Sequence, residues 1–395
     1  MNQAESEQPV PAPSGRAVVC LAMNAVAHYR EHFLNLLKSR LHTEGIELLF
    51  IHGTHYRGHN IGGSVDWATP ACLRSWGSLT WLSVLKPTRG ADLVIVPQVL
   101  KHLWIYPLLF RHLLGIQKIA LWGHGKVFSA RREDRLATRL KNTVSRWCDW
   151  WFAYTEGTAR IVRDEIGFDP ARITVVNNAV DTRALSEAKA RLDPVVLDSL
   201  RRELGIESSN IGIFVGGMYH SHHHSKRLTF LVEACIEVRR IVPDFHMIFL
   251  GGGPEQHVVE IAAAEHPWIH YPGIRKGTEA VPYWALARIC LNPGLVGLGI
   301  LDCLALGVPM LTSNVSYHSP EIEYLEHEVN GIIIDDRNDP AVFARAAAGL
   351  MADPSRIDTL ASNGRITASQ ITNESMVDRF TDGILRVLNL DPIHP

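Results

Sequence analysis

The stretch IGIFVGGMYHSHHHSKRLTFLVEAC, residues 211–235, contains the pattern that decides the fold. Its apolar start, Ile211–Val215, is typical of a buried strand, and Gly216 and Gly217 follow directly. Four apolar residues downstream then follow the i, i+3, i+4, i+7 spacing of one helix face: Leu228, Leu231, Val232 and Cys235. A strand that leads through glycines into a helix is the repeating unit of a parallel α/β sheet.

The same alternation occurs along nearly the whole chain. In the N-terminal half it predicts strands at Ala17–Ala22, Glu47–Ile51, Asp92–Pro97, Lys118–Trp122, Trp150–Tyr154 and Ile173–Val176. In the C-terminal half it predicts strands at Ile211–Val215, His246–Leu250, Trp268–Tyr271, Arg288–Asn292, Val308–Thr312 and Ile332–Asp335. Two such sets predict two doubly wound, Rossmann-like α/β domains that face each other across a cleft.

The expected domain boundaries follow from these two sets. We expect a disordered tail (1–15), an N-terminal Rossmann-like domain (16–180), a polar linker region (181–210), a C-terminal Rossmann-like domain (211–372) and a C-terminal helix (373–395) that can pack back on the N-terminal domain. The apolar face expected for that helix consists of Met376, Phe380, Ile384 and Val387.

The composition limits the function classes. A net charge of -2 over 395 residues gives no global field that favours nucleic acid as a partner. The six cysteines form no C-x-x-C pair, which is typical of reduced thiols in a cytoplasmic protein. The start of the chain lacks the pattern of a signal peptide, and the longest apolar stretch, 103–114, is interrupted by Arg111 and His112. We therefore expect a soluble or at most peripheral protein.

The loop after the first strand, residues 23–30, carries no G-x-G-x-x-G fingerprint. Walker-type and H-E-x-x-H motifs are also absent from the sequence. A nicotinamide, flavin or zinc-protease function is therefore not expected.

Three constellations in the C-terminal half are suited to a phosphorylated sugar ligand. Lys226 lies ten residues beyond Gly216 and enters a helix, where a cation and helix N–H groups can meet a diphosphate; the alternative is a plain loop with an exposed lysine. Gly251–Glu255 can approach a base or ribose, or can simply close a strand-helix connection. In 292–309, three glycines precede Asp302, which can accept from a ribose diol or merely cap a helix. The histidines in 220–224 lack partners with metal-ligand spacing, so we expect no metal site there.

Taken in order, these segments resemble the donor half of the retaining, GT-B-fold glycosyltransferase family 4. The matching stretches are Lys226, Gly251–Pro254, Ala305–Pro309, Pro320–Glu321, Asn330–Gly331 and Asn177–Asp181. The resemblance implies a metal-independent hexosyltransferase, and His124 in the Trp122–Gly125 loop would touch the transferred sugar. It implies His124, Lys226 and Asp302 as catalytic residues and these donor contacts: Gly216, Gly217, Gly252, Pro254, Gly294, Leu295, Val296, Gly297, Leu298 and Glu321.

The chain departs from the family pattern at two positions. The first of the family's paired glutamates is replaced by Gly294, within a Pro-Gly-x-Val-Gly-Leu stretch, and Asp302 stands at the second. The cation expected beside Gly216 is also missing. We interpret this as a variant donor site in which the Gly294–Leu298 amides and Glu321 supply part of the sugar contact.

The acceptor is assigned to the N-terminal half. Asn24, His28 and Arg30 follow the first strand and are placed to meet the acceptor, and Arg30 could supply the missing cation. Between Lys126 and Arg146 the sequence has seven cations against Glu133 and Asp134, with Trp147 close behind. Such a segment can dock on anionic lipid at the inner face of a membrane, or can be a solvated helix.

The expected function is transfer of a hexose-type sugar from a UDP- or GDP-sugar to a glycan or lipid-linked acceptor, with retention, in polysaccharide or glycolipid synthesis. Two alternatives stay open: a nucleotide-sugar epimerase, and a catalytically weak scaffold that binds sugar nucleotides.

Overall fold

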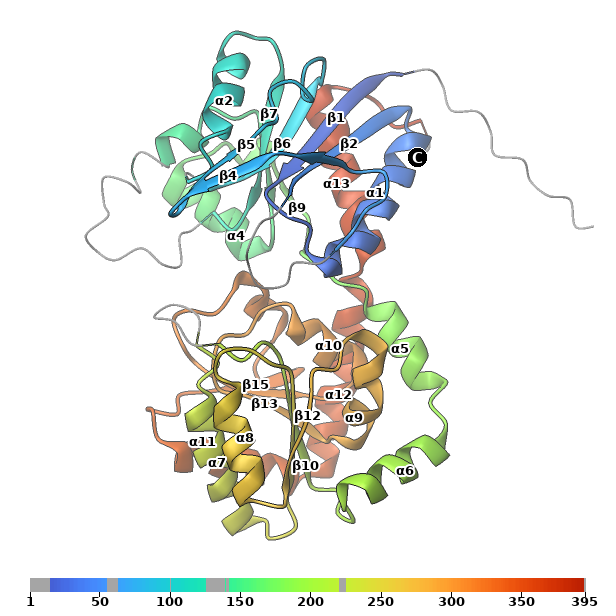
Figure 1. Ribbon diagram of the computed structural model, residues 1–395, viewed down its shortest axis with the longest axis vertical. Helices are drawn as coiled ribbons and strands as arrows, with labels where there is room; N and C mark the ends of the chain where they lie inside the picture. Colours follow the sequence, from blue (N-terminus) through green and yellow to red (C-terminus); the bar gives the residue numbers. More distant parts are fainter. Residues whose placement is uncertain are drawn as a thin grey trace, which may run out of the picture. The chain divides into compact units, whose positions relative to one another are not determined.

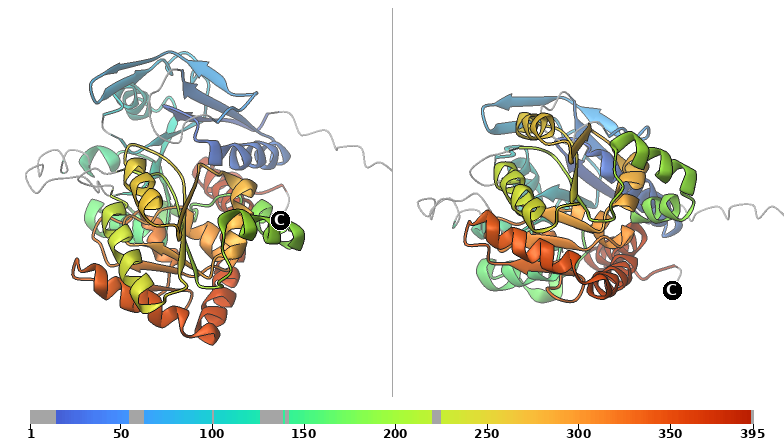
Figure 2. Two further views of the ribbon diagram at one scale, coloured as in Figure 1. Left: turned by 60° about the horizontal axis from the view of Figure 1, so that its bottom comes forward. Right: turned by 90° about the horizontal axis from the view of Figure 1, so that it is seen from below.

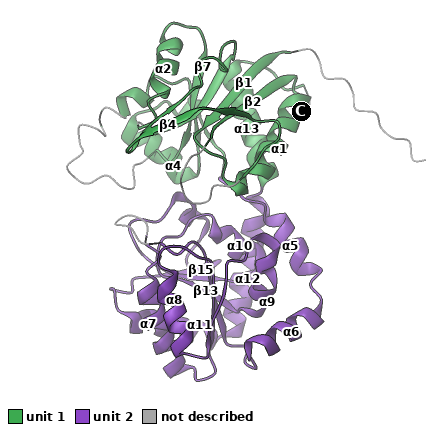
Figure 3. Cartoon of the chain, viewed as in Figure 1, with its two compact units in different colours: residues 1–177, 373–395 green, residues 178–372 purple. Residues whose placement is uncertain are grey.

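The chain folds into two compact units in a computed structural model that describes residues 15–54, 63–99, 101–125, 139, 142–219 and 225–393 (Figure 3). Unit 1 comprises Met1–Asn177 and Asn373–Pro395, and unit 2 comprises Asn178–Thr372. The chain therefore leaves unit 1 once and returns to it for its last helix.

Unit 1 is built on a parallel seven-stranded sheet in the order β3-β2-β1-β6-β7-β8-β9. Its strands are β1 (Ala17–Met23), β2 (Ile46–Gly53), β3 (Thr69–Ala71), β6 (Leu93–Pro97), β7 (Lys118–Gly123), β8 (Trp150–Ala153) and β9 (Ile173–Val175). A short antiparallel hairpin of β4 (Leu73–Trp76) and β5 (Leu79–Leu82) is added. The α-helices are α1 (Glu31–Thr43), α2 (Ile105–Leu113), α4 (Glu156–Ile161) and α13 (Asn373–Leu388). The shorter helical turns are η1 (His28–Arg30), η2 (Val162–Ile166) and η3 (Pro170–Arg172).

The last helix, α13, is part of the core of unit 1 (Figure 1). It packs against α1 and against β8 and β9. Phe380 is fully buried and stacks on Phe152 with 4.4 Å between ring centroids, and it lies 5.4 Å from Phe33 of α1. Gly383 allows the close approach, because a Cβ there would lie 2.5 Å from Phe152. The predicted apolar face is buried at Met376, Phe380, Ile384 and Val387.

Unit 2 is built on a parallel six-stranded sheet in the order β12-β11-β10-β13-β14-β15. Its strands are β10 (Ile211–Val215), β11 (His246–Leu250), β12 (Ile269–Gly273), β13 (Ile289–Asn292), β14 (Met310–Ser313) and β15 (Gly331–Ile334). The α-helices are α5 (Thr182–Ala190), α6 (Pro194–Leu204), α7 (Leu228–Ile241), α8 (Gln256–Glu265), α9 (Val281–Leu286), α10 (Gly299–Leu306), α11 (Pro340–Met351) and α12 (Pro354–Gln370), and η4 (Gly277–Ala280) and η5 (Pro320–Tyr324) are single turns.

Helices cover both faces of this sheet (Figures 1 and 2). On one face α7 packs against α8 and α11, and on the other α10 packs against α5 and α12. The apolar face predicted for α7 is buried at Leu228, Leu231 and Cys235, each 1% exposed or less. This is the doubly wound α/β architecture that the strand-helix alternation predicts.

The polar stretch 181–210, for which we expected a linker, is instead helical and belongs to unit 2. Asp181 and Asp193 accept hydrogen bonds from Ala184 N and Val195 N, and these N-caps start α5 and α6. α5 packs on α10, and Lys189 donates a hydrogen bond to the carbonyl of Leu306. Both helices are mostly exposed, so few apolar residues reveal them in the sequence.

Some predicted segments fall outside the described residues. These are the tail before Gly15, residues 220–224 of the histidine-rich loop, and most of the basic segment between Lys126 and Arg146. In the part of the chain that is described, no helix is long and apolar enough to cross a membrane.

Candidate functional site

The predicted donor residues gather at one edge of the unit 2 sheet. From β10 the chain adds strands on one side, β11 and then β12, and afterwards crosses to the other side to add β13, β14 and β15. The order of strand addition therefore reverses between β10 and β13. Ligands of doubly wound sheets bind outside the carboxyl ends of the strands at such a switch point. The loop Gly216–Gly217 follows β10, Gly251–Gly253 follows β11, and 293–298 follows β13, so all three predicted loops meet there.

The first two loops are joined backbone to backbone. Met218 N donates to the Gly252 carbonyl at 2.9 Å, and Glu255 N donates to the Met218 carbonyl at 3.0 Å. Gly251 has a φ of 135°, and a Cβ there would overlap the carbonyl oxygen of Gly216. These glycines are therefore required for the close contact between the loops, whether or not they also touch a ligand.

Lys226 is buried at the centre of this edge, with only 7% of its surface exposed. Its Nζ donates to the carbonyl of Leu295 at 2.5 Å, and a Cβ on Gly216 would lie 3.9 Å from that Nζ. Burial lowers the pKa of Lys226 to about 8. No carboxylate of the described residues pairs with this desolvated cation, which is held by the neutral carbonyl of Leu295 beside the glycine loop.

Gly294, where the family resemblance predicts a glutamate, lies directly on the backbone of the segment before α7. A Cβ at this position would overlap the Ser225 carbonyl oxygen and would lie 2.5 Å from the carbonyl carbon of Lys226. In this structure the position has no room for any side chain. The glycine is therefore a packing requirement that lets the β13 loop and Lys226 lie together.

The amides of this loop are not all open to a ligand, which corrects our interpretation of the Gly294–Leu298 stretch. Leu295 N donates to the Ser225 carbonyl at 2.8 Å, and Val296 N donates to His318 Nδ1 at 3.0 Å. Among the described residues we find no protein acceptor for the amides of Gly297 and Leu298, which immediately precede α10. The first N–H groups of a helix have no partner within the helix, so these two are the amides suited to an anion.

His318 holds the loop in place and was not found from the sequence. Since Nδ1 accepts from Val296 N, the imidazole carries its proton on Nε2, which donates to the Ser313 carbonyl at 2.8 Å. Burial lowers the pKa of His318, and the charge of Lys226 lowers it further. A neutral histidine therefore fixes the start of α10 relative to the end of β14.

Arg227 was also missed, because a single basic residue before a helix carries no specific signal. It adopts a left-handed φ of 54° and binds Asp336 at 2.6 Å. The same guanidinium donates to the Pro293 carbonyl and the Ser313 hydroxyl, and it lies 3.7 Å from the ring centroid of Phe230. Arg227 therefore ties the ends of β13 and β14 to the start of α7.

Asp302 lies in the first turn of α10 and is half-buried. Burial raises the pKa of its carboxyl to about 7. No hydrogen bond or ion pair joins it to Lys226. Burial thus disfavours the charged form of both side chains, the ammonium of Lys226 and the carboxylate of Asp302, relative to water.

Glu321 is 3% exposed and accepts a hydrogen bond from Asn178 Nδ2 at 2.5 Å. Tyr324 donates its hydroxyl to the Asn178 carbonyl at 3.1 Å. The predicted sugar contact at Glu321 is thus already bound to the segment that begins unit 2. Pro254 follows Gly253 in the turn after β11, on the same edge of the sheet.

Of the residues of unit 1 predicted to bind the acceptor, Asn24 is buried and His28 is exposed. Asn24 is 7% exposed, and its carboxamide bonds Thr80 at 3.0 Å, His102 at 3.2 Å and Trp104 at 3.0 Å. It is therefore a structural anchor of the loop after β1. His28, by contrast, is exposed in η1.

Arg30 and His124 lie around the same aromatic side chains of unit 1. The Arg30 guanidinium is buried 4.7 Å from the ring centroid of Trp122 and 6.0 Å from that of Tyr154. His124 follows β7 and contacts Tyr154 edge to face at 4.3 Å. The cation, the imidazole and the two aromatic rings thus form one group at the carboxyl ends of β7 and β8.

No group of three or more histidine, cysteine or carboxylate side chains that could hold a metal ion occurs among the described residues. The histidines of residues 220–224 lie outside them.

Comparisons with known proteins cover both halves of the chain. Residues 31–184 match the family "Glycosyltransferase Family 4", and residues 209–353 match "Glycosyl transferases group 1". The alpha-monoglucosyldiacylglycerol synthase of Acholeplasma laidlawii is 21% identical over 62% of this chain and 60% of its own length. The D-inositol 3-phosphate glycosyltransferase of Salinispora arenicola is 25% identical over 73% of this chain and 64% of its own length. The matched part of this chain therefore spans less than two thirds of either relative.

Solved structures share the fold over nearly the whole chain. HepE of Anabaena, solved with UDP, has a TM-score of 0.67 at 13% identity and covers 94% of this chain and 100% of its own. A glycosyltransferase from Rickettsia africae has a TM-score of 0.70 at 12% identity and covers 95% of this chain and 99% of its own. With a family match on each half and this two-unit fold, the chain belongs to family 4 of the glycosyltransferases and has the GT-B fold.

Proposed function

We propose that this protein transfers a hexosyl group from a nucleotide sugar, bound by unit 2, to a glycan or lipid-linked acceptor. The observation that carries the proposal is the set of groups at the β10/β13 switch point. A buried ammonium on Lys226, two glycine loops and the free start of α10 lie at one edge of the sheet. Each suits a diphosphate ester, and Asp302 adds an acceptor for hydroxyl groups.

The chemistry follows from these groups. The bond between the sugar C1 and the diphosphate oxygen breaks, and the acceptor oxygen forms a new bond to C1. The acceptor proton passes to the departing phosphate, so the atoms balance without a cofactor. Lys226 and the Gly297 and Leu298 amides neutralise the negative charge that develops on the diphosphate, and a preorganised cation of this kind takes the place of a divalent metal. We propose retention of configuration, with attack on the same face that the phosphate leaves.

The relatives support a sugar-nucleotide donor and a lipid or polyol acceptor. One is named a glucosyldiacylglycerol synthase, another an inositol phosphate glycosyltransferase, and HepE has been solved with UDP-glucose. We therefore propose UDP-glucose as the first donor to test, with GDP-sugars as the alternative. We assign His124 to the transferred sugar and His28 and Arg30 to the acceptor side, in unit 1.

We further propose a cytoplasmic protein in peripheral contact with anionic membrane, in polysaccharide or glycolipid synthesis. This rests on the unpaired cysteines and on the basic sequence between Lys126 and Arg146.

The test combines a binding and a turnover measurement. A thermal-shift panel of UDP- and GDP-sugars should show a raised melting temperature with the true donor, because a ligand that binds only the folded state stabilises it. Lys226→Ala should lower transfer by roughly a hundredfold, as expected when one group that stabilises transition-state charge is lost. Asp302→Asn should weaken donor binding and so lower transfer at limiting donor, because the carboxylate that accepts from the donor hydroxyls is lost. Unchanged donor turnover in both variants would refute the assignment of this edge as the donor site.

The same samples separate the alternatives. Incubation with donor alone distinguishes an epimerase, which would return an altered nucleotide sugar without any acceptor. Donor binding without transfer or slow hydrolysis would indicate a scaffold. Proton NMR of the anomeric centre of the product tests retention, and full activity after EDTA treatment tests independence of metal.

A further inference from the structure

α2 of unit 1 exposes an apolar face to solvent. Its inward side buries Ile105, Leu108 and Leu109. The outward side carries four more large apolar side chains at helical spacing, exposed by 37%, 63%, 58% and 59%: Tyr106, Phe110, Leu113 and Leu114. A surface helix of a globular protein normally presents polar residues on that side. The outward face of α2 is therefore a surface that needs a partner.

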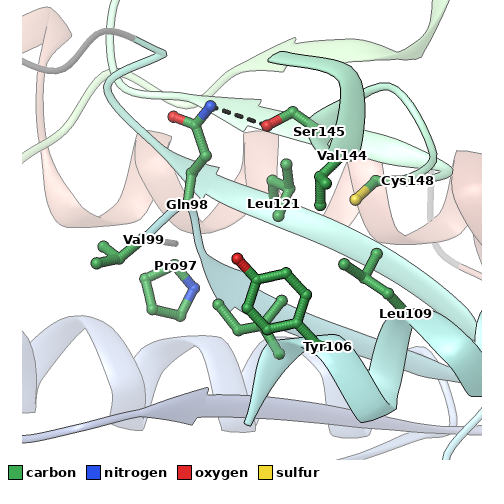
Figure 4. Close-up of a pocket in the computed structure, with 10 residues that line it drawn as sticks. Pro97, Gln98, Val99, Tyr106, Leu109, Leu121, Val144, Ser145 and Cys148 are labelled. Carbon is green, nitrogen blue, oxygen red and sulfur yellow. Dashed lines mark hydrogen bonds between the residues drawn. The ribbon is translucent and has the colours of Figure 1, made fainter. Parts of the chain in front are cut away.

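The apolar surface continues past both ends of the helix. Ile116, in the turn that leads to β7, is 63% exposed, and Val99 before α2 is 38% exposed. Figure 4 shows the adjoining crevice, where Tyr106 stands opposite Leu121 and Val144. The crevice encloses only about 20 Å³, the space of about one water molecule. A ligand on this side of unit 1 would therefore lie along the surface rather than inside it.

Cations flank this surface. Lys101 lies four residues before the start of α2 and is exposed, and Arg111 of α2 donates to the hydroxyl of Thr88, which is close in sequence to the exposed Lys86 and Arg89. The carboxylates at the opposite end of the helix already have partners. Asp92 accepts from Val18 N, and Asp149 accepts from Ile119 N and lies 3.1 Å from His112. The surface thus combines exposed apolar groups with three exposed cations, Lys86, Arg89 and Lys101, which form no ion pair with any described residue.

These two properties are complementary to an anionic lipid bilayer, which offers hydrocarbon below a layer of negative headgroups. A second copy of the chain is less suitable, because a two-fold interface would place each set of cations near its own equivalent. We propose that the outward face of α2, formed by Tyr106, Phe110, Leu113, Leu114 and Ile116, docks unit 1 on anionic membranes. The inference extends the proposed function, since it assigns part of the membrane contact to α2 in addition to the basic sequence between Lys126 and Arg146, but it does not require sugar transfer.

The test is co-sedimentation of the full chain with vesicles of phosphatidylcholine, with and without phosphatidylglycerol. The unaltered protein should bind the anionic vesicles more tightly. The double variant Phe110→Glu/Leu113→Glu should bind them at least about tenfold more weakly, because two half-exposed apolar side chains no longer enter the bilayer. Ile261→Glu, at a 56% exposed position on α8 of unit 2, is the matched control and should bind as the unaltered protein does.

Three results would overturn the proposal: no vesicle binding by the unaltered chain, equal binding by the double variant, or equal loss in the control. A dimer that becomes a monomer in the double variant, with vesicle binding unchanged, would show self-association instead. Phe110→Ser/Leu113→Ser repeats the test without added charge, and melting temperatures check folding. Transfer to a water-soluble acceptor should be equal in all variants, so a chain that never transfers sugar contradicts the proposed function and leaves the vesicle result standing.

Discussion

Replacing Gly294 with the glutamate that the family resemblance predicts there should damage this protein. In Gly294→Ala the new Cβ would overlap the Ser225 carbonyl oxygen and lie 2.5 Å and 2.6 Å from the carbonyl carbon and Cα of Lys226. All three are backbone atoms, so no side chain can rotate away to make room. Lys226 must therefore move with its segment, and Gly294→Glu adds a buried carboxylate to the same strain.

The expected magnitude follows from the cost of overpacking. Extra atoms in a close-packed site cost about 1–3 kcal/mol. For a unit of this size, each kcal/mol lowers the melting temperature by about 2–4 °C. Gly294→Ala should thus melt about 2–12 °C below the unaltered protein. Because Lys226 is displaced from the Gly216 loop, the KM for the donor should also rise.

Calorimetry and donor kinetics on three variants make the test. Gly297→Ala is the matched control, since its Cβ would lie 3.6 Å from the Ser319 hydroxyl, an ordinary contact. It should melt no lower than the unaltered protein, because a glycine replaced by alanine without strain stabilises the fold by about 0.4–1 kcal/mol. If Gly294→Glu melts and binds donor as the unaltered chain does, the packing explanation of this glycine is wrong.

Four further predictions concern single side chains. The pKa of Asp302, raised to about 7, lies above its unfolded value, so the ligand-free protein should lose stability as the pH rises from about 4 to 7. Urea unfolding should show a smaller loss in Asp302→Asn. The pKa of Lys226, lowered to about 8, has the opposite effect, and stability should rise as the pH rises from about 8 to 10.5. Lys226→Met should therefore be more stable than the unaltered protein at pH 7, yet calorimetry should show no donor binding. His318→Leu leaves the Val296 N–H unpaired, so it should cost about 1–3 kcal/mol of stability and raise the donor KM more than it lowers kcat. His318→Asn can still accept that hydrogen bond and should recover most of the stability and most of the donor KM. Phe380→Ala should cost about 3–5 kcal/mol in the unfolding transition of unit 1, measured by calorimetry, while UDP still stabilises the transition of unit 2.

The sequence by itself determined the two doubly wound sheets. Every strand expected from an apolar run is present, with ends that differ by two residues or fewer. A buried parallel strand needs a continuous apolar run, so its signal is local. The strands β3, β4 and β5 were not expected because each has only three or four residues, and β3 and β4 are also largely exposed. For the same reason the exposed helices α5 and α6 were taken for a linker.

The loops that we propose as the donor site of unit 2 were also visible in the sequence, because glycines after a strand and a lysine before a helix are local patterns. The topology then brings these loops together, since the carboxyl ends of parallel strands meet at one edge. What the sequence could not provide is the state of each group there. The Leu295 and Val296 amides are occupied, and Gly294 fills a space with no room for a side chain.

Those properties depend on partners that are distant along the chain. Val296 meets His318 across 22 residues, Asn24 meets Trp104 across 80, and Arg227 meets Asp336 across 109. A hydrogen bond is directional and short, so which donor meets which acceptor is decided only when strands and helices are packed. Apolar periodicity, by contrast, is set by burial along one element. For this reason the sequence alone determined the architecture and the edge of the sheet at which the predicted glycine loops and Lys226 meet, while the tertiary structure decided which amides, cations and carboxylates there are left for a ligand.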